Sequence, residues 1–262
     1  MSKSNPEVDP ECPLCGRLGW VRRDVPVGDP DFGELSPCSC LVPELERQQL
    51  ERLQSVSGLG RELQDKGFEN FVEIHRNSSP NRRPVSNRAA PRAARAFAQD
   101  PQGWLIIGGA NGTGKTHLAA AIANERLARG EPALFVVVPQ LLDHLRSTYA
   151  PHSPVSYDRR FGQICTTPLL ILDDLGAQQS TEWAWEKLYQ ILVRRRSQRL
   201  PLVVTTNLDV GAGSGQSESS ERQPASLDRR IASRLAEVGW VRRVLITAPD
   251  WRRHPGGGKG GR

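Results

Sequence analysis

The stretch WLIIGGANGTGKT, residues 104–116, decides the fold of this chain. Its last eight residues, 109–116, follow the P-loop pattern G-x-x-x-x-G-K-T, in which glycines let the backbone approach a triphosphate. A short apolar run, 104–107, precedes the loop, and an alanine-rich, helix-prone run, 117–127, follows it. Strand, glycine loop and helix in this order are the context that identifies a phosphate-binding P-loop.

The residues of this loop have separate tasks toward ATP. Backbone N–H groups and the positive N-terminal end of the following helix face the phosphates. Lys115 places a charge on the β- and γ-phosphate oxygens, and the hydroxyl of Thr116 is a natural Mg²⁺ ligand. The predicted nucleotide-binding residues are Gly109, Ala110, Asn111, Gly112, Thr113, Gly114, Lys115, Thr116 and His117.

Composition sets the outer limits. The 262 residues allow one large domain and a small one, and the hydrophobic content of 37% is enough for a packed core. The formal net charge of +6 favours an acidic partner such as nucleic acid, although an arginine-rich proteome explains it equally well. The polar start MSKSNPEVDP is no signal peptide, and the apolar runs are too short to span a bilayer, so we expect a soluble, cytoplasmic protein without membrane contact.

Four of the five cysteines form two close pairs near the start of the chain. Cys12 and Cys15 are separated by two residues, Cys38 and Cys40 by one, and 22 residues lie between the pairs. Four thiolates can close a tetrahedral zinc site, whose binding energy would fold a loop-rich module with little core. We therefore predict a zinc-binding module at residues 1–43; a labile redox or iron–sulfur site is the alternative.

Between this module and the P-loop domain we expect a helix and a basic linker, residues 44–90. Leucines recur near helical spacing up to residue 66, and residues 76–90 contain Ser, Asn, Pro and Arg but no acid. The linker is a solvated tether or a contact with nucleic-acid phosphates.

Strands and helices alternate over residues 91–251, which predicts a parallel sheet covered by helices on both faces. Within this domain we expect a disordered insertion at 211–226, and after it a flexible basic tail at 252–262. The predicted strands are 104–108, 133–138, 168–173, 201–206 and 241–247, and the predicted helices are 91–99, 115–129, 139–149, 181–198 and 227–237.

A second nucleotide motif is PLLILDDLG, residues 168–176, a buried strand that ends in two carboxylates. We interpret it as a Walker B element. Asp173 can hold Mg²⁺ together with Thr116, and Asp174 stands where a general base would orient and deprotonate the attacking water. Open parallel sheets bind ligands at the carboxyl ends of their strands, where both acids lie.

Two further segments complete the predicted site. Asn207 ends the strand at 201–206, and its amide can bond a γ-phosphate oxygen and the attacking water. Arg230 and Arg234 are four residues apart on one helix face, from which an arginine can reach the γ-phosphate of a neighbouring subunit. A solvated basic helix or a DNA-phosphate contact is the alternative. The predicted catalytic residues are Lys115, Asp174, Asn207, Arg234 and Arg230.

The order of these motifs resembles that of the AAA+ ATPases of the initiator and helicase-loader group, specifically the DnaC/DnaI-like loaders and the IstB transposition helper. The stretches that carry the resemblance are GGANGTGKTHLAAAIA, LLILDDLG, VVTTN and RRIASRL. The resemblance covers roughly residues 91–250. It implies a P-loop AAA+ fold of three α/β/α layers, ATP with Mg²⁺, self-association through the ATP sites and binding to single-stranded DNA. The cysteine module resembles the zinc-binding domain of DnaI-type loaders, which contacts the replicative helicase.

Two departures from the family pattern matter. Position 174 is Asp where many AAA+ members carry Glu, so we expect slow or partner-dependent hydrolysis. Only about one strand and a short tail follow Leu235, so we expect no full C-terminal lid.

On these grounds we expect an ATP-dependent loader of the replicative helicase that acts in DNA replication. The alternatives are an IstB-like transposition helper, whose client would be a transposase, and a nucleotide-gated binding scaffold with little hydrolysis. The expected cofactors are ATP, Mg²⁺ and Zn²⁺.

Overall fold

A computed structural model describes residues 12–22, 24–29, 32–71, 89–147, 157–178, 181–208, 228–248 and 250. The predicted insertion at 211–226, the tail at 252–262 and nearly all of the basic linker at 76–90 lie outside these residues. The chain divides into two compact units, residues 1–55 and 56–262.

The first unit contains the cysteine pairs and a small hairpin. Strands β1 (Trp20–Arg22) and β2 (Leu35–Pro37) pair in antiparallel fashion, with Trp20 opposite Pro37. Helix α1 (Val42–Val56) starts directly after the second cysteine pair. On α1, Arg47 pairs with Glu44 and Glu51, one turn away on either side, which supports a solvated helix.

The second unit is built on a five-stranded, all-parallel sheet in the order β4-β5-β6-β3-β7. The strand that enters the P-loop therefore lies between the strand that ends near Asn207 and the last described strand. The strands are β3 (Trp104–Gly109), β4 (Ala133–Val137), β5 (Leu169–Leu175), β6 (Leu202–Thr206) and β7 (Val241–Ile246).

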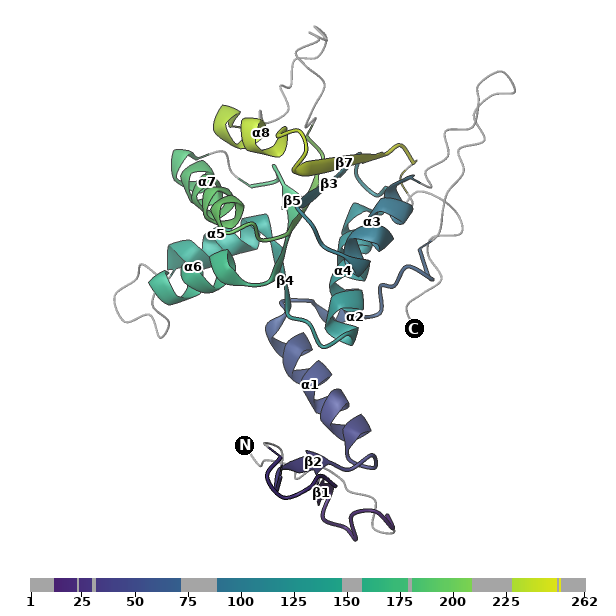
Figure 1. The fold of residues 1–262 in the computed structure, drawn as a ribbon. Coiled ribbons are helices and arrows are strands. Elements are labelled where there is room, and N and C mark those ends of the chain that lie inside the picture. Colours follow the sequence, from purple (N-terminus) through teal and green to yellow (C-terminus); the bar gives the residue numbers. More distant parts are fainter. Residues whose placement is uncertain are drawn as a thin grey trace, which may run out of the picture. The chain divides into compact units, whose positions relative to one another are not determined.

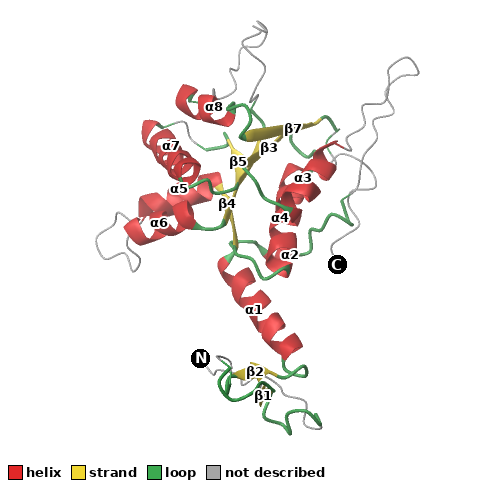
Figure 2. Ribbon diagram, in the orientation of Figure 1, coloured by secondary structure: helices red, strands yellow, loops and turns green. Residues whose placement is uncertain are grey.

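Helices cover both faces of this sheet. Figure 1 shows α3 and α4 on one side and α5, α6 and α7 on the other, and Figure 2 gives the same three layers by element type. The predicted α/β/α architecture is thus confirmed. The helices of this unit are α2 (Arg61–Gln64), α3 (Ala89–Gln99), α4 (Lys115–Ala128), α5 (Val138–Ser147), α6 (Tyr157–Thr166), α7 (Glu182–Ser197) and α8 (Arg229–Leu235).

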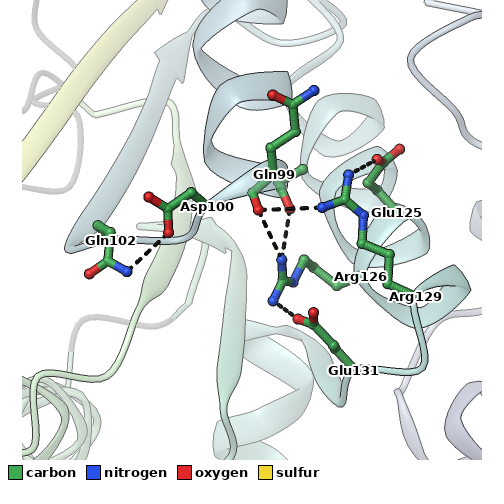
Figure 3. Close-up of polar contacts among 8 residues, drawn as sticks. Gln99, Asp100, Gln102, Glu125, Arg126, Arg129 and Glu131 are labelled. Atoms are coloured by element: carbon green, nitrogen blue, oxygen red, sulfur yellow. Dashed lines mark hydrogen bonds and ion pairs between the residues drawn. The ribbon is translucent and has the colours of Figure 1, made fainter.

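Two arginines, one in the last turn of α4 and one directly after it, bond the C-terminal end of α4 to that of α3. Arg126 donates to the carbonyl oxygens of Ala98 (3.1 Å) and Gln99 (3.3 Å), and Arg129 donates to Gln99 as well (3.3 Å; Figure 3). Pairing with Glu131 and Glu125 holds the two guanidinium groups in place. The last carbonyls of α3 are thereby satisfied, as helix ends require.

The segment 57–71, here called the strap, lies along α4 and β4. The backbone N–H of Phe135 in β4 donates to the carbonyl of Ser57 (2.6 Å). On α4, the amide of Asn124 donates to the carbonyls of Leu63 and Lys66, at 2.8 Å each. The strap thus connects the end of α1 to the helix that begins at the P-loop.

A buried arginine joins three elements on the opposite face. Arg195 of α7 is 0% exposed, and burial lowers the pKa of its guanidinium to about 10, so it stays charged at neutral pH. It ties the end of α6 to the starts of β5 and β6. Its acceptors are the carbonyl oxygens of Ile164, Cys165, Thr167, Pro168 and Pro201, at 2.5–3.4 Å.

No helix within the described residues is long and apolar enough to cross a membrane. Among them, β7 is the last regular element, and the expected absence of a full C-terminal lid stays a prediction.

Candidate nucleotide site

The P-loop turns from β3 into α4 through backbone conformations that require glycine. Gly112 (φ +73°) and Gly114 (φ +97°) are in the left-handed region. A Cβ atom at Gly112 would lie 1.7 Å from the carboxylate of Asp250, and one at Gly114 would lie 2.7 Å from the ring of Phe71. The loop is therefore closely flanked by two side chains, Phe71 and Asp250, that the sequence did not indicate.

Two oxygen groups from separate motifs meet beside this loop. The hydroxyl of Thr116 is 3.1 Å from each carboxylate oxygen of Asp173, the first acid of the Walker B strand. Asp173 is 4% exposed, and burial raises the pKa of its carboxyl group, against the hydrogen bonds from Thr205 and Thr116. Hard oxygen donors at this spacing fit Mg²⁺, with the carboxylate supplying the negative charge that the ion prefers.

Lys115 is folded back onto its own loop. Its ammonium donates to the carbonyl oxygen of Ala110 at 2.7 Å, and the side chain is nearly buried. The positive charge of Lys115 thus lies within the loop that is expected to bind the phosphates of ATP.

Asp174 and Asn207 come together at the ends of adjacent strands. The amide of Asn207 lies 3.4 Å from a carboxylate oxygen of Asp174. The backbone of Asp174 has φ +61°, a left-handed conformation that is uncommon outside glycine and best tolerated by Asn and Asp. Its N–H donates to the hydroxyl of Thr205 (2.9 Å).

His117 faces the strap. Its Nε2 atom is 2.9 Å from the carbonyl of Gly67, and its ring is edge-on to Phe71 at 5.3 Å between centroids. Burial lowers the pKa of the imidazole. A role of His117 toward nucleotide stays a prediction, while its contact with the strap is direct.

The two predicted arginines differ in their surroundings. Arg230 donates to Asp228 (3.2 Å) and Glu186 (3.1 Å), and its guanidinium lies 5.3 Å from the ring centre of Tyr189. Arg234, one turn further along α8, is half-buried. The predicted roles of both at a neighbouring ATP site stay predictions.

The four cysteines of the first unit converge as predicted. The sulfur atoms of Cys12 and Cys38 are 3.7 Å apart and those of Cys15 and Cys40 are 3.6 Å apart, and all four lie within 4.8 Å of one another. Sulfurs at about 2.3 Å from a tetrahedral Zn²⁺ lie about 3.8 Å apart, so the cluster fits zinc. Backbone N–H groups of Cys15 and Leu14 lower the pKa of Cys12 to about 7, whereas burial and the neighbouring cysteines raise the pKa of Cys40 to about 12. Of these two thiols, Cys12 therefore loses its proton more readily.

Comparison with known proteins places this nucleotide site in a family. The model of the family described as IstB-like ATP binding protein matches residues 65–243, about two thirds of the chain. The chain belongs to this family. The match includes the P-loop, both Walker B acids, Asn207 and the arginines of α8, and it begins after the cysteine cluster.

Relatives of this chain include replicative helicase loaders. DnaC of Buchnera aphidicola subsp. Schizaphis graminum is 28% identical over 187 residues, 71% of this chain and 73% of that protein. DnaI of Bacillus subtilis (strain 168) is 30% identical over 157 residues, 58% of this chain, and the match spans about half (48%) of its length. The crystal structure of DnaI superimposes with a TM-score of 0.53 at 27% identity, covering 76% of this chain and 98% of that one. The chain thus has the α/β fold of the DnaC/DnaI group, and its own sheet order β4-β5-β6-β3-β7 is that of AAA+ ATPases.

Proposed function

We propose that this protein is an ATPase that loads the replicative helicase onto DNA. The observation that carries the proposal is the approach of Thr116 to Asp173, 3.1 Å from each carboxylate oxygen, because it brings the P-loop and the Walker B strand together where Mg²⁺ and ATP would bind. The kinship with DnaC and DnaI loaders supports the helicase as client.

In the proposed reaction each group has one task. Lys115 neutralises the β- and γ-phosphates, and Thr116 and Asp173 hold Mg²⁺, which would supply positive charge to the transferring phosphoryl group. Asp174 accepts a proton from the attacking water, and Asn207 orients this water and the γ-phosphate. Arg234, with Arg230 beside it, reaches the site of a neighbouring copy, so that hydrolysis depends on assembly.

The cysteine cluster supports a loader over a transposition helper. A zinc-stabilised N-terminal module would contact the helicase, while the AAA+ unit binds single-stranded DNA and further copies of itself in the cytoplasm. The family description names IstB, so a transposase as the client is the second candidate, and a nucleotide-gated scaffold with little hydrolysis is the third.

The deciding experiment is native mass spectrometry of the full chain with the replicative helicase of its own organism, with and without ATP. We expect a complex whose mass responds to ATP, and no such response for Lys115→Ala, which should keep its fold but lose ATP. An ATP-dependent complex with the transposase and none with the helicase would overturn the loader assignment. Absence of ATP turnover in every complex would exclude an ATPase and favour the third candidate, a nucleotide-gated binding scaffold.

A further inference from the structure

The two acids of the Walker B strand lie opposite a single residue of β6. Leu172 of β5 pairs with Val204, and Leu175 pairs with Thr206, with a register shift between them. Asp173 and Asp174 therefore both oppose Thr205. Two residues opposite one define a β-bulge, a device that re-aims side chains beside active sites.

The hydroxyl of Thr205 bonds both of these acids. It donates to a carboxylate oxygen of Asp173 at 2.6 Å and accepts the backbone N–H of Asp174 at 2.9 Å. Thr205 is 1% exposed, so water does not easily replace either bond. The hydroxyl donates its single proton to the carboxylate of Asp173, and one of its lone pairs accepts the N–H of Asp174. Among side chains of this size, only serine and threonine carry a hydroxyl that can do both.

We propose that Thr205 is a positioning residue of the nucleotide site, which fixes Asp173 and Asp174 relative to each other. The bulge takes the Asp174 N–H out of the regular ladder, and the hydroxyl replaces the lost acceptor, which keeps Asp174 in its left-handed conformation. On Asp173, the bond from Thr205 can persist when Thr116 turns to Mg²⁺. Asn207 follows Thr205 by two residues, directly after β6 ends. One segment therefore carries both the residue that orients the two acids and the residue proposed to bind water and γ-phosphate.

This inference deepens the proposed ATPase function and rests on it only for its catalytic consequence. The bonds themselves join residues of this chain only, so they can be tested without ATP. Two variants separate shape from hydrogen bonding: Thr205→Val keeps the volume and loses the hydroxyl, and Thr205→Ser keeps the hydroxyl.

Strand β6 offers a matched control in the next residue. Thr206 is equally buried, but its hydroxyl donates to the carbonyl of Leu175 (2.7 Å) and accepts the N–H of Leu208 (3.0 Å). Thr206→Val therefore removes a buried hydroxyl from the same strand without touching either acid.

The first measurement is amide hydrogen exchange by NMR on the full, nucleotide-free chain. We expect the Asp174 amide to exchange about fivefold faster or more in Thr205→Val, and at the wild-type rate in Thr205→Ser. In Thr206→Val the Leu208 amide should exchange faster and the Asp174 amide should not. An unchanged Asp174 amide in Thr205→Val, or a serine variant that behaves like valine, would overturn the inference.

The second measurement compares binding and turnover of ATP. Thr205→Val should bind ATP without Mg²⁺ as the wild type does, but lose the gain in affinity on adding Mg²⁺, and its kcat should fall about tenfold to a hundredfold with a smaller change in KM. Thr205→Ser should restore both. Wild-type values in Thr205→Val would refute the positioning role. A wild-type chain without turnover would instead refute the proposed ATPase, and amide exchange would still decide the role of Thr205.

Discussion

At the scale of single residues, Asp174 combines a rare backbone conformation with a proposed chemical role. Its φ of +61° costs an ordinary L-residue on the order of 1 kcal/mol, and Asp and Asn less. The hydrogen bond from its N–H to Thr205 and the bulge hold this conformation in place. A Glu at this position would bring a longer side chain to a place where Asn207 lies beside the carboxylate of Asp174.

This geometry allows conformation and chemistry to be separated by two substitutions. Asp174→Asn should leave the free energy of unfolding within about 0.5 kcal/mol of the wild type, because Asn tolerates the left-handed region. It should keep ATP binding and lower kcat about 10²- to 10⁴-fold, because an amide is no general base. Asp174→Ala should be equally inactive and less stable by about 1 kcal/mol. Urea denaturation and ATP turnover measure both effects; equal stability of the two variants would contradict the conformational argument.

The residues of the nucleotide site were predictable to the extent that they stand in local motifs. Lys115 and Thr116 lie in one loop, and Asp173 follows from an apolar strand with acids at its end. Phe71, Asp250 and Thr205 carry no such signal, because each meets the site only through the fold. From the sequence, Thr205 looks like an ordinary core residue of an apolar strand. Only the register of β5 and β6 places it opposite Asp173 and Asp174.

At the scale of elements, Arg195 links α6, α7 and two strands through hydrogen bonds to backbone carbonyl oxygens. Arg195→Met should lower the free energy of unfolding by about 2–4 kcal/mol, because several buried carbonyls lose their donor. The exposed neighbour Arg194, whose guanidinium lies over the ring of Phe161, provides the control. Arg194→Met should cost less than about 1 kcal/mol. Equal urea midpoints for the two variants would contradict this role of Arg195.

All five strands of the sheet were predicted, within a few residues, from apolar runs and the motifs that follow them. Helix α6 and the hairpin of β1 and β2 were not. Helix α6 contains Phe161, Ile164 and Cys165 at helical spacing, but it is short, and Arg195 of another helix satisfies its last carbonyls. Each strand of the hairpin has only three residues, and the four clustered cysteines come from the segments before β1 and after β2. Contacts of this kind are distant in sequence and leave no periodic pattern.

At the scale of the whole molecule, the division into two units predicts that the cysteine unit can be lost without losing the ATP site. In Cys12→Ser with Cys15→Ser, two of four thiolates are removed, so zinc should dissociate and roughly the first 40 residues should unfold. ATP binding by the second unit should remain within about twofold. Metal analysis and hydrogen exchange check both parts. Unchanged zinc content would refute the site, and lost ATP binding would refute the independence of the units.

In assemblies, we expect Arg234 to contribute to ATP hydrolysis at the site of the neighbouring copy, and to contribute nothing in the isolated monomer. Arg234→Ala should spare ATP binding, and it should lower hydrolysis about 10³-fold or more in assemblies, with no effect on dilute monomers, because a finger acts on the next copy. Arg230→Ala is the informative companion, since Arg230 is already paired with Asp228 and Glu186 within its own chain. Turnover measured against protein concentration distinguishes them. An equal loss in isolated Arg234→Ala monomers would contradict action between copies.

The strap has a practical consequence for anyone who shortens this chain. Strand β4 is one of the two edge strands of the sheet, and the bond from the N–H of Phe135 to the carbonyl of Ser57 occupies a donor on its open side. Gly58 lies so close that an added Cβ would be 2.2 Å from the carbonyl oxygen of Phe135. A protein that starts at residue 72 would leave this apolar strand open to pairing with other molecules, which is a common cause of aggregation. An isolated ATPase domain should therefore begin no later than residue 56.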